Sequence, residues 1–94
     1  MSENIEPVLL AYVRRTESYF RECSRTDPLF APEARAAADV LRVLESLGIS
    51  EAALTESLRL INTAASEEHY NGSVWRDFTN QIREACSAAG AAVE

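Results

Sequence analysis

The spacing of apolar residues constrains this chain most, because it repeats every three or four positions over long segments. Such spacing places side chains on one side of an α-helix. The first segment runs from Ile5 to Cys23, with apolar residues at Ile5, Leu9, Tyr12, Tyr19 and Cys23 and with Val8, Val13 and Phe20 beside them. We expect this first helix to organise the fold, with the other helices packed against it.

The same pattern predicts three further helices, over residues 32–47, 51–66 and 74–89. Pro32 suits a first helical position, and Gly48 suits the left-handed residue that ends a helix. Ser50 is a good N-cap for the third helix. Asn4 and Ser73 are expected to cap the first and fourth helices in the same way.

The whole chain favours helix, because Gly and Pro number only three each and β-branched runs are absent. Four amphipathic helices joined by short loops predict an all-α fold, a small four-helix antiparallel bundle. Orthogonal packing of the second and third helices is the alternative. A length of 94 residues predicts a single helical domain over 1–94.

The formal net charge of −6 narrows the classes of partner. An acidic surface repels nucleic-acid phosphates and anionic membranes, whereas a basic protein partner is compatible with it. No apolar run approaches the ~18 residues that a membrane span needs. The N-terminus lacks the basic and apolar regions of a signal peptide, so we expect a cytoplasmic protein.

Basic residues and cysteines indicate the cellular setting. All nine basic residues are arginine, a usage that suggests a GC-rich bacterial or phage genome. Cys23 and Cys86 lie far apart in the sequence on predicted apolar helix faces, and they form no CxxC pair. Two buried free thiols in a reducing cytoplasm are expected, and a disulfide between the first and last helices is the alternative.

No motif specifies a reaction, a cofactor or a metal. The sequence has no GxGxxG, no P-loop and no HExxH. Its one histidine, His69, is expected to be an ordinary residue of a loop. Glu67, His69 and Asp77 have the side-chain types of metal ligands but not their spacing. Neither cysteine is flanked by a base that would activate it as a nucleophile. We expect no enzyme activity and no cofactor.

The segment Val43–Ser50, followed by the third predicted helix, resembles a helix-turn-helix. A Gly-hydrophobic-Ser turn links the two helices, and Leu54 falls where the second helix would pack back on the first. The resemblance implies that the residues facing a DNA major groove are Glu51, Thr55, Glu56 and Arg59. Two of these four side chains are carboxylates, which repel phosphates. A Gly-terminated helix followed by a Ser-capped helix explains the same residues.

The apolar face of the first helix is wider than one docking groove covers, so part of it is expected to meet a second chain. The alternative is that this helix is central in the bundle and contacts several helices. Leu29 and Phe30 lie between two prolines and form either a plug on the bundle or an anchor for a partner. The residues predicted to form a protein interface are Leu10, Val13, Arg14, Glu17, Phe20, Arg21, Leu29 and Phe30.

These observations favour a non-enzymatic protein-interaction module. It would be a small acidic regulator that inhibits a larger protein, such as a transcription regulator, a toxin or a defence complex, and it would form a homodimer. One alternative is a nucleic-acid-related protein, either a DNA binder or an acidic DNA mimic. Another is a helical bundle that binds a small molecule in a pocket formed by Tyr12, Tyr19, Trp75 and Phe78.

Overall fold

The computed structural model describes residues 2–67 and 72–89, with the backbone alone for 2–7 and 89. These residues form four α-helices and one short 3₁₀ turn, labelled in chain order α1 (Ser2–Thr26), η1 (Pro28–Phe30), α2 (Ala31–Leu47), α3 (Glu51–Ala65) and α4 (Ser73–Ala89). The described part of the chain contains no strand. The predicted all-α bundle is therefore confirmed. None of the helices described here is long and apolar enough to cross a membrane.

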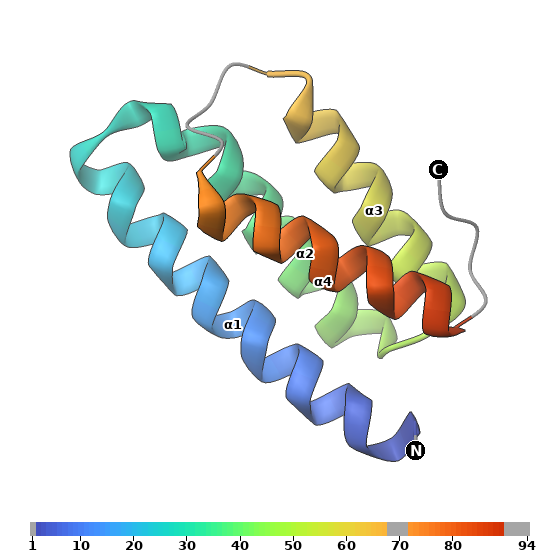
Figure 1. Ribbon diagram of the computed structural model, residues 1–94. Coiled ribbons are helices and arrows are strands. Elements are labelled where there is room, and N and C mark those ends of the chain that lie inside the picture. Colours follow the sequence, from blue (N-terminus) through green and yellow to red (C-terminus); the bar gives the residue numbers. More distant parts are fainter. Residues whose placement is uncertain (1, 68–71, 90–94) are drawn as a thin grey trace.

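Successive helices run in opposite directions (Figure 1). An ion pair of 3.1 Å between Arg14 and Glu45 joins α1 to α2, and one of 2.6 Å between Arg35 and Glu67 joins the start of α2 to the residues after α3. Because residues 48–50 connect the other ends of α2 and α3, these two helices form an antiparallel hairpin. The orthogonal alternative is not adopted.

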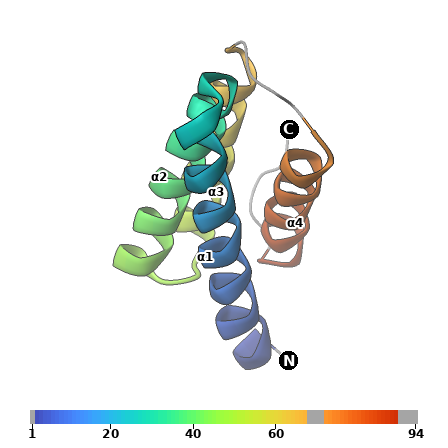
Figure 2. The ribbon, with the colours of Figure 1, turned by 90° about the vertical axis from the view of Figure 1, so that its left-hand side faces the viewer.

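The second helix, rather than the first, packs most extensively against the other helices. α2 packs extensively against both α1 and α3, whereas α4 packs mainly on α3 and makes fewer contacts with α1. α2 and α4 lie on opposite sides of the bundle, with α1 and α3 between them (Figure 2). The prediction that the first helix organises the fold is wrong, because α1 has one extensive helix neighbour and α2 has two.

Local signals set the ends of α2 and α3 as predicted. Gly48 has a φ of 74°, and its N–H donates to the carbonyl of Leu44 at 2.9 Å. The hydroxyl of Ser50 accepts a hydrogen bond from the N–H of Ala53 at 3.2 Å, which caps α3. Asp27 was not expected to cap a helix, but its carboxylate accepts from the N–H of Leu29 at 3.0 Å and fixes the start of η1.

Two predicted caps are wrong. α1 begins at Ser2, so Asn4 lies inside the helix. The residues before Asn4 contain neither proline nor glycine, and the helix continues through them. Ser73 is the first residue of α4 and therefore not the residue that precedes it.

The core stripe of α1 differs from the predicted one. The buried residues on this helix are Leu9, Val13, Thr16 and Phe20. A polar residue fits in the stripe because the hydroxyl of Thr16 donates to the carbonyl of Tyr12 at 3.0 Å. Val8 and Tyr19, which the spacing placed on or beside the core face, are 69% and 46% exposed.

The buried faces of the other helices largely match the apolar spacing. The core residues on them are Ala36, Ala37, Val40 and Leu44 of α2, Ala53, Leu54, Leu58, Ile61 and Ala64 of α3, and Trp75, Phe78, Ile82 and Cys86 of α4. Leu47 and Ala65 follow the apolar spacing of their helices, but both are exposed because each lies in the last turn of its helix. Glu33 was not expected inside, and it is wholly buried.

Adjacent residues on α1 provide a test of the core stripe. We predict that Phe20→Ala lowers the free energy of unfolding by about 3–5 kcal/mol, because the ring is 1% exposed. Tyr19→Ala is the matched control, with an expected loss of about 1 kcal/mol or less, since its side chain is half-exposed. Urea unfolding followed by circular dichroism measures both losses, and equal losses would contradict the assignment.

Candidate binding pocket

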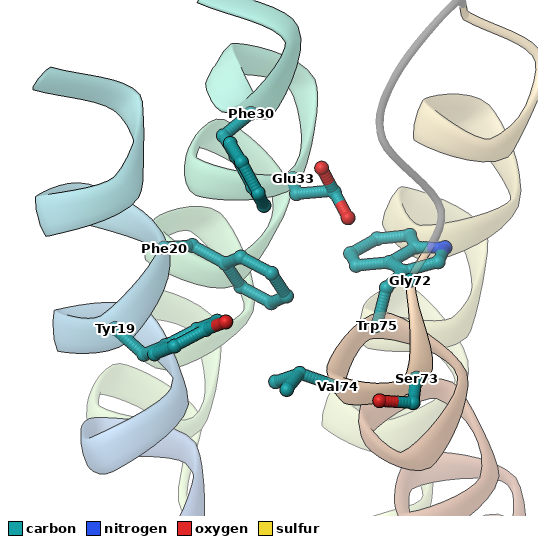
Figure 3. Close-up of a pocket in the computed structure, with 8 residues that line it drawn as sticks. All are labelled: Tyr19, Phe20, Phe30, Glu33, Gly72, Ser73, Val74 and Trp75. Carbon is teal, nitrogen blue, oxygen red and sulfur yellow. The ribbon is translucent and has the colours of Figure 1, made fainter. Parts of the chain in front are cut away.

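The seam between α1 and α4 holds a cavity at the end of the bundle near η1. Its volume is about 120 Å³, and it is shown in Figure 3. The residues that line it are Tyr19, Phe20, Phe30, Glu33, Gly72, Ser73, Val74 and Trp75. Tyr19 and Ser73 are exposed side chains, so the cavity is not sealed from solvent. Because α1 and α4 make few contacts, the helices leave this space unfilled.

Aromatic rings from three elements form the walls of the cavity. The ring of Phe20 lies 5.3 Å from that of Tyr19 and 6.0 Å from that of Trp75, both in edge-on arrangements. Its centroid is also 6.3 Å from that of Phe30, which η1 supplies. Such centroid distances are those of stabilising aromatic pairs. The rings that form the walls are therefore held in place by their contacts with one another.

Among the residues that line this cavity, the one with a carboxyl group is Glu33, which lies in the first turn of α2. Figure 3 shows its carboxylate between the rings of Phe30 and Trp75. The N-terminus of a helix favours a negative side chain, which offsets part of the free-energy cost of burying it. Sequence reasoning missed Glu33, because an acidic residue in a first turn is also what an exposed helix start contains. No signal in the sequence separates the two cases.

A hydrogen bond holds α1 and α4 together further along the seam. The hydroxyl of Tyr12 donates to Asp77 at 2.7 Å, and the ring of Tyr12 stacks 6.3 Å from that of Phe78. The guanidinium of Arg15 lies 5.7 Å from the centre of the Tyr12 ring. Burial of the phenol and then the hydrogen bond to Asp77 raise the pKa of Tyr12 above its ordinary value.

Two predicted interface residues, Val13 and Phe20, lie in the core of the single chain. These two side chains point into the bundle because α2 and α4 pack against that side of α1, while Val8 and Tyr19 of the same helix stay exposed. Leu10 is half-buried against the same core. Phe30 packs half-buried beside Phe20, as a plug, whereas Leu29 is 46% exposed. Phe30 therefore lies as the predicted plug, and the role of Leu29 as an anchor stays a prediction.

The charged interface residues all have partners within the chain. Arg14 pairs with Glu45 of α2, and Glu17 pairs with Arg21 at 3.4 Å one turn along α1. These exposed ion pairs contribute little to stability, but they orient the side chains on the outer face of α1. Their role in binding another protein stays a prediction.

The segment that resembles a helix-turn-helix folds differently from that motif. The helices of a DNA-binding pair cross at about 90–120°, whereas α2 and α3 form an antiparallel hairpin. Glu51, Thr55 and Arg59 are exposed, but the guanidinium of Arg59 pairs with the carboxylate of Glu56. The arginine that could contact DNA is therefore held by its own helix.

The aromatic residues predicted to surround a small-molecule pocket lie along the seam. Tyr19 and Trp75 line the cavity, while Phe78 is buried beneath Trp75, with a ring distance of 5.9 Å. Tyr12 stacks on Phe78 at the next position along the seam. Phe20, Phe30 and Glu33 complete the pocket and were not in the predicted set.

The two cysteines are both free, and the disulfide alternative is not adopted. Cys86 is buried as predicted, its thiol donates to the carbonyl of Leu54 at 3.3 Å, and burial raises its pKa. Cys23 is half-buried. His69 lies outside the described residues, and among those described no group of acidic, cysteine or histidine side chains is arranged to hold a metal.

The seam predicts a pH-dependent effect of Tyr12→Phe. At about pH 8, loss of the hydrogen bond to Asp77 should lower the free energy of unfolding by about 1 kcal/mol. The pKa of the Tyr12 phenol is higher in the folded protein than in the unfolded chain, where it is about 10. The hydrogen-bonded neutral phenol therefore contributes its full stabilisation below about pH 10, and this contribution is lost as the pH rises further. The difference between wild type and variant should therefore narrow above about pH 10.

Urea unfolding at a series of pH values measures this difference. The thiol of Cys86 also has a raised pKa, but it is present in both proteins, and its contribution cancels. A difference that is constant from about pH 8 to pH 11 would show that the phenol of Tyr12 does not titrate differently in the folded state.

Comparisons of the chain with protein-family models, with curated proteins and with solved structures find no match.

Proposed function

We propose that this protein is a small, acidic, non-enzymatic interaction module that binds a larger protein and inhibits it. The observation that carries the proposal is an apolar end of the bundle, formed by Tyr19, Leu29 and Phe30. Tyr19 and Leu29 are each 46% exposed, and Phe30 is half-buried against the core. The ring of Phe20 supports both Tyr19 and Phe30 from below, so this end is a preformed surface.

Charge supports a protein partner over a nucleic acid. Among the described residues, six of the nine arginines pair with carboxylates of the same chain. The positive charge is thus largely engaged, while the net charge remains −6. Aromatic and apolar anchors surrounded by charged residues are typical of protein interfaces. A basic surface on the partner would complement this charge.

The cavity favours a second candidate function, the binding of a small molecule. Pockets that hold ligands combine apolar and aromatic walls with a few polar groups, and this cavity has aromatic walls and the carboxylate of Glu33. The two candidates share one end of the molecule, since Tyr19 and Phe30 belong both to the apolar end and to the cavity.

Two exposed leucines, one in η1 just before α2 and one at the last residue of α2, allow a matched test. We predict that Leu29→Glu abolishes capture of the partner from extracts of the native cell, because a charge replaces an apolar anchor. Leu47→Glu, at the other end of α2 and 61% exposed, should capture it as the wild type does. Both variants should keep the wild-type circular dichroism. If the Leu29→Glu variant still captures the partner and the Leu47→Glu variant does not, the interface does not lie at the apolar end formed by Tyr19, Leu29 and Phe30.

The homodimer remains a prediction, and light scattering tests it. We expect a mass twice that of the 94-residue chain. With Val13 and Phe20 in the core, the large apolar side chains that α1 leaves exposed for self-association are Val8 and Tyr19. A mass equal to one chain at high concentration would remove the dimer and leave the proposed binding of a larger protein unaffected.

A further inference from the structure

We infer that α4 opens away from the bundle as one unit while α1, α2 and α3 stay folded together. The inference goes beyond the proposed interaction, because it assigns a conformational change to the single chain. It rests on the unequal packing of the four helices, on the polar links between them and on the cavity at the α1–α4 seam.

The packing separates α4 from the other three helices. α2 packs extensively against both α1 and α3, so these three helices hold one another together. α4 has one substantial neighbour, α3, and makes few contacts with α1. It lies on the side of the bundle opposite α2 (Figure 2). When α4 leaves, the contacts of α2 with α1 and α3 therefore remain in place.

The ion pairs between helices follow the same division. Arg14 pairs with Glu45 across α1 and α2, and Arg35 pairs with Glu67, which joins α2 to the residues after α3. Within the described ranges, no ion pair joins α4 to another helix. The charged links of the bundle thus stay intact when α4 opens.

Hydrogen bonds join α4 to both of its neighbours and break when it opens. The hydroxyl of Tyr12 on α1 donates to Asp77 at 2.7 Å. The thiol of Cys86 donates to the carbonyl of Leu54 on α3 at 3.3 Å, and a thiol is a weak donor. These bonds align α4 on α1 and α3, but each contributes only a small part of the stability of the fold.

The cavity of about 120 Å³ lies along the seam that opens. Atoms that border a void lack van der Waals partners on that side, so separating the helices there breaks fewer contacts than separating a filled seam. Proteins open in cooperative units whose free energies of opening lie below that of global unfolding. The packing, the links and the cavity together identify α4 as such a unit.

Cys86 reports the opening, because its thiol is wholly buried on the inner face of α4. The other cysteine of the chain is Cys23, and Cys23→Ser leaves Cys86 as the single thiol. The probe is Ellman's reagent without denaturant at about pH 8, where an exposed thiol is partly ionised and reactive. A control chain carries Cys23→Ser, Cys86→Ala and Val40→Cys, which place its one thiol at a buried position of α2.

We expect Cys86 to react at least about tenfold faster than the thiol of the control chain. Its rate should also depend less steeply on urea, because the opening of one helix exposes less surface than global unfolding does. The core substitutions of the control chain ease its unfolding and so work against the expected difference. A Cys86 rate no faster than that of the control overturns the inference.

Two variants of the Cys23→Ser chain separate opening from global unfolding. Tyr12→Phe should raise the Cys86 rate about fivefold, because it removes a hydrogen bond that is lost on opening. Val40→Ala lowers the free energy of unfolding, but it should change the Cys86 rate by less than about twofold, since α2 keeps its contacts in the open form.

The Val40→Ala result has a clear opposite. If it raises the Cys86 rate by the factor by which it raises the equilibrium constant of unfolding, α4 leaves only when the whole chain unfolds, and the inference is wrong. Circular dichroism checks that each variant folds. If a variant of α2 does not fold, the urea dependence of the Cys86 rate is compared with that of global unfolding in the Cys23→Ser chain, and equal dependences overturn the inference.

Discussion

The packing of one face of α2 against both α1 and α3 is the constraint on which the rest of the structure depends. Its inner face is built from small and medium residues, Ala36, Ala37, Val40 and Leu44, which let both neighbouring helices approach closely. Gly48 and Ser50 then reverse the chain, so that α3 returns along the same helix. With three helices fixed in this way, α4 closes the remaining side of the core with Trp75, Phe78 and Ile82.

The weaker contact of α4 with α1 explains why the cavity lies where it does. α4 is held mainly by α3, and α1 meets it through the hydrogen bond of Tyr12 to Asp77 and the stacking on Phe78. Towards η1 the seam is filled by large rings that pack edge to face and leave space between them. Small cavities arise where bulky side chains from separate elements meet, because their shapes do not interdigitate fully.

Periodicity predicted the four helices because each buries one stripe against neighbours, and Gly48 and Ser50 act through local backbone geometry. The rotation of α1 was not predictable to one residue. Tyr19 and Phe20 are both aromatic and adjacent, and the choice between them depends on which helices flank α1. The pocket joins residues from α1, η1, α2 and α4, and no local pattern encodes such a junction.

Glu33 shows how the core of this small bundle accommodates an acidic residue where a helix begins. A chain of 94 residues has a modest core and little excess stability. Burying a carboxyl group costs free energy, and the N-terminal end of α2 offsets part of that cost. Glu33 is wholly buried at this position, and it lies beside the cavity that aromatic rings line.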